Sequence, residues 1–198
     1  MFVPEARVDG SDDIGVLEGS DVVVITAGAK QKPGQTRMDL AETNTSICRK
    51  LIPDLLRVSP NAVLLMVTNP VDVLTYAALK LSGLETGRVL GSGTVLDSSR
   101  FRFLLAQHCE VAVQNVHAYI AGEHGDSEIP LWSSASIGNI PLRDWARPGR
   151  LTDKERIAIF ESVRTSADRV IAGKGATNYA ICLAVSSILQ AILWDEGR

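Results

Sequence analysis

Apolar runs alternate with amphipathic segments along the first half of the chain. Residues 21–26 and 61–68 each hold a run of β-branched and other apolar residues after one polar residue, and residues 88–90 hold a shorter one. Such runs are typical of strands buried on both faces of a parallel sheet. Between them, residues 38–58 and 71–81 carry apolar side chains at helical spacing. This succession of strand, helix, strand, helix and strand predicts an open α/β sheet.

The second half of the chain has a different pattern, in which helical segments dominate. Residues 94–108 are predicted to form an apolar helix, and residues 116–120 a short strand. Residues 152–172 have amphipathic spacing, with Thr152 as a candidate N-cap before two acidic residues of the first turn. Residues 178–193 are apolar on several faces, which predicts a buried helix. The change of pattern predicts a domain boundary just after the third strand.

Composition and charge are those of a globular protein without a nucleic-acid or membrane partner. The 198 residues are 45% hydrophobic and 22% charged, as in an ordinary globular protein. A net charge of −3 argues against a nucleic-acid partner, because phosphate binding depends on clustered lysine and arginine. No apolar run approaches the roughly 20 residues needed to span a bilayer, and residues 1–11 lack a signal-peptide pattern. We therefore expect neither a nucleic acid nor a membrane as a partner.

The cysteines and histidines give no sign of a disulfide framework or a metal site. Cys48, Cys109 and Cys182 are odd in number and far apart, and no C-x-x-C pair occurs. This usage favours a reducing cytoplasm. No histidine lies at ligand spacing from a cysteine or another histidine, so we predict no metal site.

Candidate chemistry lies beyond the carboxyl ends of the predicted strands, where open α/β sheets bind ligands. Polar or glycine-rich segments follow the strands at residues 26–37, 68–72 and 91–100. Within the last of them, Asp97 and Arg100 are three residues apart at the start of a helix and share one face. The pair is either a simple ion pair of the first helical turn or a pair with a function.

His124 stands in a glycine-rich turn, between Glu123 and Gly125. A packing histidine is unusual in such an exposed setting, which favours a function, whereas a lone histidine is usually structural or solvated. The run G-S-G-T-V-L at residues 91–96 lacks the third glycine of a dinucleotide fingerprint, and we interpret it as a tight packing turn.

Five strings, in order over nearly the whole chain, carry a resemblance to a known family. They are ITAGAKQKPGQTRM from residue 25, VTNPVDV from residue 67, GSGTVLDSSRFRFLL from residue 91, NVHAYIAGEHGDSEIPL from residue 115 and GKGATN from residue 173. Together they resemble the lactate/malate dehydrogenase family, and within it the allosteric bacterial lactate dehydrogenase branch. Any single string would be modest support, whereas the set is specific.

The resemblance implies a fold and an activity. Residues 1–92 would be the C-terminal part of an NAD-binding domain with a Rossmann-type sheet, and residues 93–198 the N-terminal part of an α+β catalytic domain. The implied activity is the NAD-dependent, reversible reduction of pyruvate to L-lactate. A malate dehydrogenase, or a non-catalytic fragment that interacts with other subunits, is the alternative.

The resemblance also assigns roles to residues. His124 would give a proton to the substrate, Asp97 would orient its imidazole, and Arg100 would bind the substrate carboxylate. Arg37 would polarise the carbonyl, and Gln31 would leave room for a methyl group where malate dehydrogenases have an arginine. The implied substrate-binding residues are Gln31, Arg37, Asn69, Arg100 and Thr177, and the implied NAD-binding residues are Thr26, Ala27, Gly28, Ala29, Val67, Thr68 and Asn69.

Partners are implied as well. Arg102 and His117 match the pair that binds fructose 1,6-bisphosphate at a subunit interface in allosteric members of the family. The alternative for this pair is a helix-surface arginine and a strand histidine without a ligand. The family further implies a homotetramer for the full-length protein.

Some parts of the family pattern have no counterpart in the sequence. The family's G-x-G-x-x-G fingerprint and the acidic residue that binds the adenosine ribose are absent. Residues 1–9 are similar to the family's third strand, so its first two strands are missing, as are its C-terminal strands and last helix. We therefore expect a chain truncated at both ends, with little or no activity by itself and an unpaired apolar strand edge.

Overall fold

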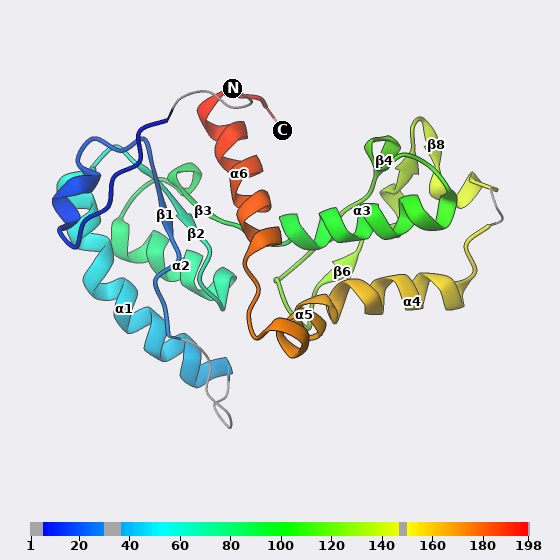
Figure 1. Ribbon diagram of the computed structural model, residues 1–198, viewed down its shortest axis with the longest axis horizontal. Coiled ribbons are helices and arrows are strands. Elements are labelled where there is room, and N and C mark those ends of the chain that lie inside the picture. Colours follow the sequence, from blue (N-terminus) through cyan, green and yellow to red (C-terminus); the bar gives the residue numbers. More distant parts are fainter. Residues whose placement is uncertain (1–5, 30–36, 147–149, 198) are drawn as a thin grey trace. The chain divides into compact units, whose positions relative to one another are not determined.

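The computed structural model describes residues 6–29, 37–146 and 150–197. The chain divides into two compact units, residues 1–91 and residues 92–198, and Figure 1 shows the elements of each. None of the described helices is long and apolar enough to cross a membrane.

The first unit is a parallel sheet covered by helices. Strands β1 (Val22–Ile25), β2 (Val63–Met66) and β3 (Val89–Gly91) pair in that order, and β1 is in register with β2 from Val22 opposite Val63. Helices α1 (Arg37–Val58) and α2 (Val71–Ser82) connect the strands and pack against each other. Short 3-10 helices, η1 (Ile14–Leu17) and η2 (Thr86–Arg88), precede β1 and β3. The predicted α/β succession is confirmed.

The core of this unit comes from the apolar runs. Leu64 and Met66 of β2, Ile52 of α1 and Leu74 of α2 have no exposed surface. Burial of one such side chain contributes about 1.5–3 kcal/mol, so the packed sheet and helices stabilise one another. The carboxyl ends of all three strands consequently lie at one edge of a stable sheet, which is where a ligand site is expected.

The start of the chain differs from the expectation. The strand predicted within residues 1–9 is not formed at residues 6–9, which are exposed and have no regular structure. A strand needs a hydrogen-bonded neighbour, and within the described residues β1 pairs only with β2. Instead, Arg7 and Asp9 form an exposed ion pair at 2.8 Å. Residues 1–5 lie outside the described part of the chain.

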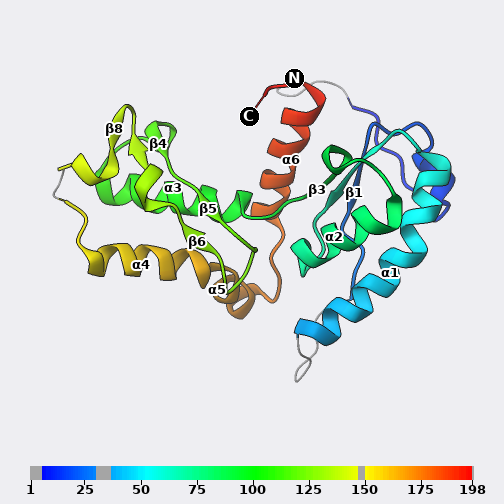
Figure 2. The same ribbon diagram turned by 180° about the vertical axis from the view of Figure 1, so that it is seen from behind.

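The second unit combines helices with small antiparallel sheets, as Figure 2 shows from behind. One sheet consists of β4 (Val116–His117), β7 (Ser136–Ile137) and β8 (Ile140–Pro141), in that order, and the other of β5 (Ile120–Ala121) and β6 (Ile129–Pro130). The helices are α3 (Val95–Cys109), α4 (Asp153–Arg164), α5 (Ser166–Lys174) and α6 (Tyr179–Leu193). Short 3-10 helices lie at Val113–Asn115, Trp132–Ser134 and Leu142–Asp144.

Helix α3 is the centre of this unit. Its Phe101 and Leu105 have no exposed surface, and Phe101 meets the ring of Trp132 edge-on, with centroids 4.9 Å apart. Helices α4 and α6 both pack against α3, and so do β4 and β5. Because α3 is held from several sides, the residues of its first turns have fixed positions.

Three details of the second unit correct the sequence-based prediction. The helix predicted at residues 152–172 is two helices, because it breaks at Thr165, whose hydroxyl and N–H both bond to the Glu161 carbonyl. The strand predicted at residues 116–120 is split into β4 and β5. The helix predicted to be buried, α6, buries only Ala184, since one packing neighbour, α3, covers a single stripe of it within this unit.

Candidate active site

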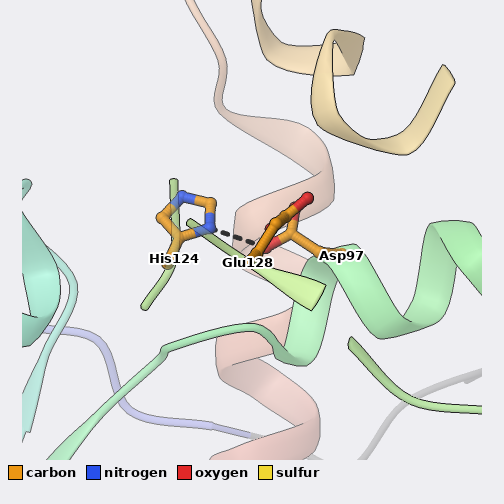
Figure 3. Close-up of side chains that lie close together, drawn as sticks. All are labelled: Asp97, His124 and Glu128. Carbon is orange, nitrogen blue, oxygen red and sulfur yellow. Dashed lines mark hydrogen bonds and ion pairs between the residues drawn. The ribbon is translucent and has the colours of Figure 1, made fainter. Parts of the chain in front are cut away.

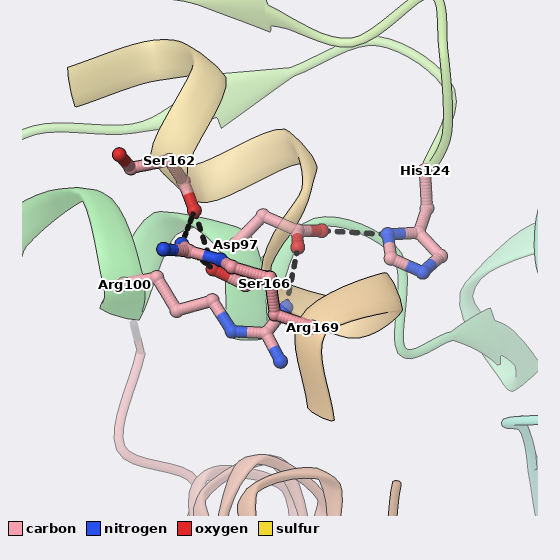
Figure 4. Close-up of polar contacts among 6 residues, drawn as sticks. All are labelled: Asp97, Arg100, His124, Ser162, Ser166 and Arg169. Atoms are coloured by element: carbon pink, nitrogen blue, oxygen red, sulfur yellow. Dashed lines mark hydrogen bonds and ion pairs between the residues drawn. The ribbon is translucent and has the colours of Figure 1, made fainter. Parts of the chain in front are cut away.

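An acid, an arginine and a histidine meet at the start of α3. Asp97 is 3% exposed, and its two carboxylate oxygens have different partners. Oδ2 is 2.6 Å from Nδ1 of His124, and Oδ1 is 3.3 Å from Nη1 of Arg100. Figure 4 shows Asp97 between the imidazole and the guanidinium. A carboxylate only accepts, so Nδ1–H of His124 is the donor and Nε2 is left as the other reactive nitrogen of the ring.

The loop that carries His124 is fixed against α3. It connects β5 to β6, and Thr94, the N-cap of α3, and Ser98 of α3 both bond Ile120 of β5, just before the loop. The Thr94 hydroxyl donates to the Ile120 carbonyl at 2.8 Å, and the Ile120 N–H donates to Ser98 Oγ at 2.9 Å. Gly122 then turns the chain with a φ of +92°, a conformation that a side chain would strain. These contacts hold His124 beside Asp97.

A second buried carboxyl completes this group. Glu128 precedes β6 and is 4% exposed, and its Oε1 has no hydrogen-bond partner within the described residues. One ring nitrogen of His124 and one carboxylate oxygen from each of Asp97 and Glu128 lie within 4.8 Å of one another (Figure 3). Burial, with the charge on Asp97, raises the pKa of Glu128 to about 7. The sequence analysis gave Glu128 no role.

A cavity of about 370 Å³ opens beside Arg100 in the same unit. It is lined by Arg100 from α3, by Thr177, and by Arg169 and Lys174 of α5. Arg169 donates from Nη2 to the Ser162 carbonyl at 2.7 Å, as Figure 4 shows. The rest of the lining is mostly apolar, with Leu96, Val170 and Ile181 among it. The cavity therefore suits a small organic acid, with Arg100 as the cation for its carboxylate. Arg169 and Lys174 were missed by the sequence analysis, because Lys174 lies beyond the helix predicted at residues 152–172 and residues five apart do not share a helix face.

The loops after β1 and β2 form a second candidate region, in the first unit. A Cβ added to Gly28 would lie 2.2 Å from Cγ2 of Thr68, so only glycine fits there. Asn44 of α1 accepts from the Ala29 N–H at 2.7 Å and donates to the Asn69 carbonyl at 2.8 Å. The sequence analysis missed this bridging asparagine.

This region fits a nucleotide cofactor. The predicted NAD-binding residues 26–29 are exposed at the carboxyl edge of the sheet, and a backbone without a side chain at Gly28 allows a ligand to approach closely. Val67 and Thr68 are half-buried and Asn69 is exposed. Thr68 Oγ1 donates to the Ala27 carbonyl at 2.9 Å, which joins the two loops.

The remaining predicted residues are only partly described. Gln31 lies outside the described residues, and Arg37 is the first residue of α1, with its side chain also outside them. Arg102 donates from Nε to the Ala118 carbonyl at 3.1 Å and lies over the Tyr119 ring. His117 is exposed in β4. Arg102 therefore contacts the residue that follows His117, between β4 and β5.

Comparisons with known proteins agree with the two units. Residues 1–91 match the lactate/malate dehydrogenase NAD binding domain, and residues 94–198 match the lactate/malate dehydrogenase alpha/beta C-terminal domain. The chain belongs to the lactate/malate dehydrogenase family. The resemblance stated from the five strings is thereby confirmed.

Relatives within the family are lactate dehydrogenases. The chain is 54% identical to an L-lactate dehydrogenase of Bifidobacterium animalis subsp. lactis, over 100% of the chain and 62% of that protein. It is 52% identical to an L-lactate dehydrogenase of Thermus aquaticus, over 91% of the chain and 59% of that protein. The chain thus spans about three fifths of the length of these relatives.

Solved structures agree with the fold. The structure of MGS-M5, a lactate dehydrogenase from a Medee basin deep-sea metagenome library, matches with a TM-score of 0.93 and 39% identity. The match covers 100% of this chain and 63% of that one. The minor L-lactate dehydrogenase of Enterococcus mundtii matches with a TM-score of 0.86 and 37% identity, over 91% of this chain and 58% of that one. The partial Rossmann-type sheet joined to a catalytic-domain segment is confirmed.

Proposed function

We propose that this chain carries the acid–base and substrate-binding residues of an NAD-dependent L-lactate dehydrogenase, which interconverts pyruvate and L-lactate. The observation that carries the proposal is the contact of His124 with buried Asp97 at 2.6 Å, with Arg100 on the other oxygen of that carboxylate. Such a base with its orienting acid, next to a cation for a carboxylate, suits a 2-oxo acid substrate. The identity of 54% to a named L-lactate dehydrogenase supports the same activity.

Proton transfer is the task of His124. In pyruvate reduction the imidazolium would donate its Nε2 proton to the oxygen that forms on the substrate, and in lactate oxidation the neutral ring would take a proton back. The bond from Nδ1 to Asp97 fixes the tautomer and stabilises the protonated ring. Histidine suits both directions because its ordinary pKa of about 6.5 is close to neutral pH.

The cavity beside Arg100 is the proposed binding site of the substrate. Arg100 is 18% exposed at its side chain, so a substrate carboxylate that pairs with its guanidinium would be largely shielded from water. Thr177 lines the same cavity and would contact the bound acid. As the family resemblance implies, Arg37 would polarise the carbonyl, and Asn69 would either bond the same oxygen or help to position the nicotinamide.

The cofactor would be held at the other candidate region. Thr26 to Ala29 and Val67 to Asn69 would bind NAD, with Gly28 allowing close approach of the backbone. When bound, NADH would supply the two electrons that reduce the carbonyl carbon. Asn44 would keep the two loops at a fixed separation, through its bonds to Ala29 and Asn69.

The experiment is an assay of NADH oxidation with pyruvate on two proteins. One is the 198-residue chain, for which we expect little or no turnover. The other, here termed the complete enzyme, is this chain extended to the length of its relatives with the flanking segments of the Bifidobacterium animalis protein. We expect the complete enzyme to turn over pyruvate and its His124→Asn variant to be inactive. Equal activity of that variant would refute the proposal, and an inactive complete enzyme would favour a non-catalytic role.

Substrate choice is part of the proposal. Gln31 would face the variable end of the substrate and favour pyruvate, whereas an arginine there would pair with the second carboxylate of oxaloacetate. A malate dehydrogenase is therefore the second candidate, and a higher kcat/KM for oxaloacetate than for pyruvate would select it.

Regulation and assembly are proposed from the family resemblance as well. Arg102 and His117 would bind fructose 1,6-bisphosphate, as in allosteric members of the family, in a homotetramer located in the cytoplasm. Titrating the complete enzyme with the sugar bisphosphate should lower the apparent KM for pyruvate, and Arg102→Gln should abolish the effect. An unchanged KM would remove this part of the proposal.

A further inference from the structure

Glu128 is a buried carboxyl for which the reaction outlined above has no use. It is 4% exposed, and Oε1 has no hydrogen-bond partner within the described residues. A buried carboxylate without such a partner costs free energy, so a site that retains one needs an explanation. Figure 3 shows this carboxyl beside Asp97, on the Nδ1 side of the imidazole.

The charged side chains that act on Glu128 come from three parts of the second unit. Asp97 and Arg100 face it from α3, His124 from its own loop and Arg164 from the end of α4. Burial is the largest cause of its raised pKa, the negative charge of Asp97 adds to it, and the three cations oppose it. The affinity of Glu128 for a proton therefore depends on whether His124 is charged. Two groups that interact in this way titrate as a pair.

We propose that Glu128 is a charge-compensating, positioning residue for His124: it is ionised while the imidazole is protonated, and it takes up a proton from solvent after His124 has given its own proton to the substrate. With Asp97 ionised throughout, the three side chains carry a net charge of about −1 in both states. A second negative charge never accumulates in the buried site, so the imidazole loses its proton without drawing Asp97 out of place. This inference rests on the proposed function for its link to turnover, but not for the coupling between the two groups.

The first test measures His124 without any turnover. The imidazole signals of the 198-residue chain, which has three histidines, are followed by NMR against pH, and His124→Asn identifies the signal of interest. In Glu128→Gln the titration midpoint of His124 should fall by about one pH unit, because a neighbouring negative charge is lost. Glu123→Gln is the matched control, since Glu123 is exposed in the same loop and bonds Ser127 at 2.8 Å. Its midpoint should stay within about 0.2 units of the wild type.

The second test uses the complete enzyme. The basic limb of the pH profile of kcat/KM for pyruvate should move to lower pH in Glu128→Gln by the same amount as the NMR midpoint. Glu128→Asp keeps the charge but places it farther from His124, so it should give a smaller shift in the same direction. This variant provides the test if the glutamine variant does not fold. Midpoints that are the same in the glutamine, aspartate and control variants would overturn the inference. A coupled titration in an enzyme inactive toward pyruvate would overturn only the proposed function.

Discussion

The two units hold the polar groups of their candidate sites by different kinds of interaction. In the first unit, the candidate NAD-binding loops are held by neutral hydrogen bonds, from Asn44 to Ala29 and Asn69, above a core with no exposed surface at Leu64 and Leu74. In the second unit, two carboxyls, Asp97 and Glu128, are buried beside His124. One region is a rigid frame made by apolar burial and backbone contacts. The region in the second unit holds two carboxyl groups buried away from solvent.

The difference matches the two tasks proposed for the units, cofactor binding in the first and proton transfer in the second. Neutral bonds at a sheet edge fix a backbone without depending on pH, as a cofactor site requires. Buried charges respond to one another and to pH, as a site that transfers protons requires. The comparison therefore predicts that substitutions in the second unit alter rates and pH profiles, whereas those in the first alter specificity, cofactor affinity and stability.

Asp97→Asn should have the largest effect. An asparagine keeps the shape of the side chain but removes the charge, so His124 loses its fixed tautomer and the stabilisation of its protonated form. We expect kcat/KM of the complete enzyme for pyruvate to fall by about 10³–10⁴-fold. Asp144→Asn is the control, since that aspartate is exposed and pairs only with neighbouring Arg143 at 3.6 Å among the described contacts. A loss below tenfold in Asp97→Asn would contradict the role assigned to this acid.

Gln31→Arg should have the next largest effect, on specificity rather than rate. An arginine would pair with the second carboxylate of oxaloacetate and would be left unpaired by pyruvate. We expect the ratio of kcat/KM for oxaloacetate to that for pyruvate to rise about a thousandfold, measured by NADH oxidation on the complete enzyme. Lys32→Arg, one position removed, should leave this ratio unchanged. An unchanged ratio in Gln31→Arg would show that residue 31 does not face the substrate.

Sequence patterns predicted the first unit better than the second. The apolar runs at β1, β2 and β3 and the helical spacing of α1 and α2 are local signals, and each element forms at the predicted place. The exposed α6 shows the limit of such signals. Its apolar surface predicts that something covers it, but periodicity does not say which element does so or where that element lies.

The candidate site was predictable where the side chains are close in sequence or match a family string. Asp97, Arg100 and His124 were singled out in this way, and the structure brings them together, although their roles stay predictions. Glu128 stands in the same string and is buried, and the charges that act on it include Arg100 of α3 and Arg164 at the end of α4, both far away in the sequence. A charged residue before a short strand looks solvated until tertiary packing is known.

Gly28→Ala tests the frame of the first unit. The new methyl group would lie 2.2 Å from Cγ2 of Thr68, so one of the loops must shift. We expect a loss of about 2 kcal/mol in the free energy of unfolding and a raised KM for NADH. Adding Thr68→Ser should restore most of both, because serine lacks Cγ2 and keeps the hydroxyl bonded to Ala27. Gly10→Ala, where nothing lies within 4 Å, is the control.

Glu128→Gln should change stability by about as much as Gly28→Ala, but only as the pH changes. The pKa of Glu128 is raised from 4.5 to about 7 in the folded chain, so folding favours its protonated form. Its contribution to stability is fully present below pH 4.5 and is lost as the pH rises through 7. The glutamine variant does not titrate, so from pH 5 to pH 8 its free energy of unfolding should rise by about 2 kcal/mol relative to the wild type. Urea denaturation at both pH values measures this difference, and Glu123→Gln should show none. A difference that is constant with pH would mean that Glu128 is ionised as readily in the folded chain as in water, and the contrast between the two units would then rest on Asp97 alone.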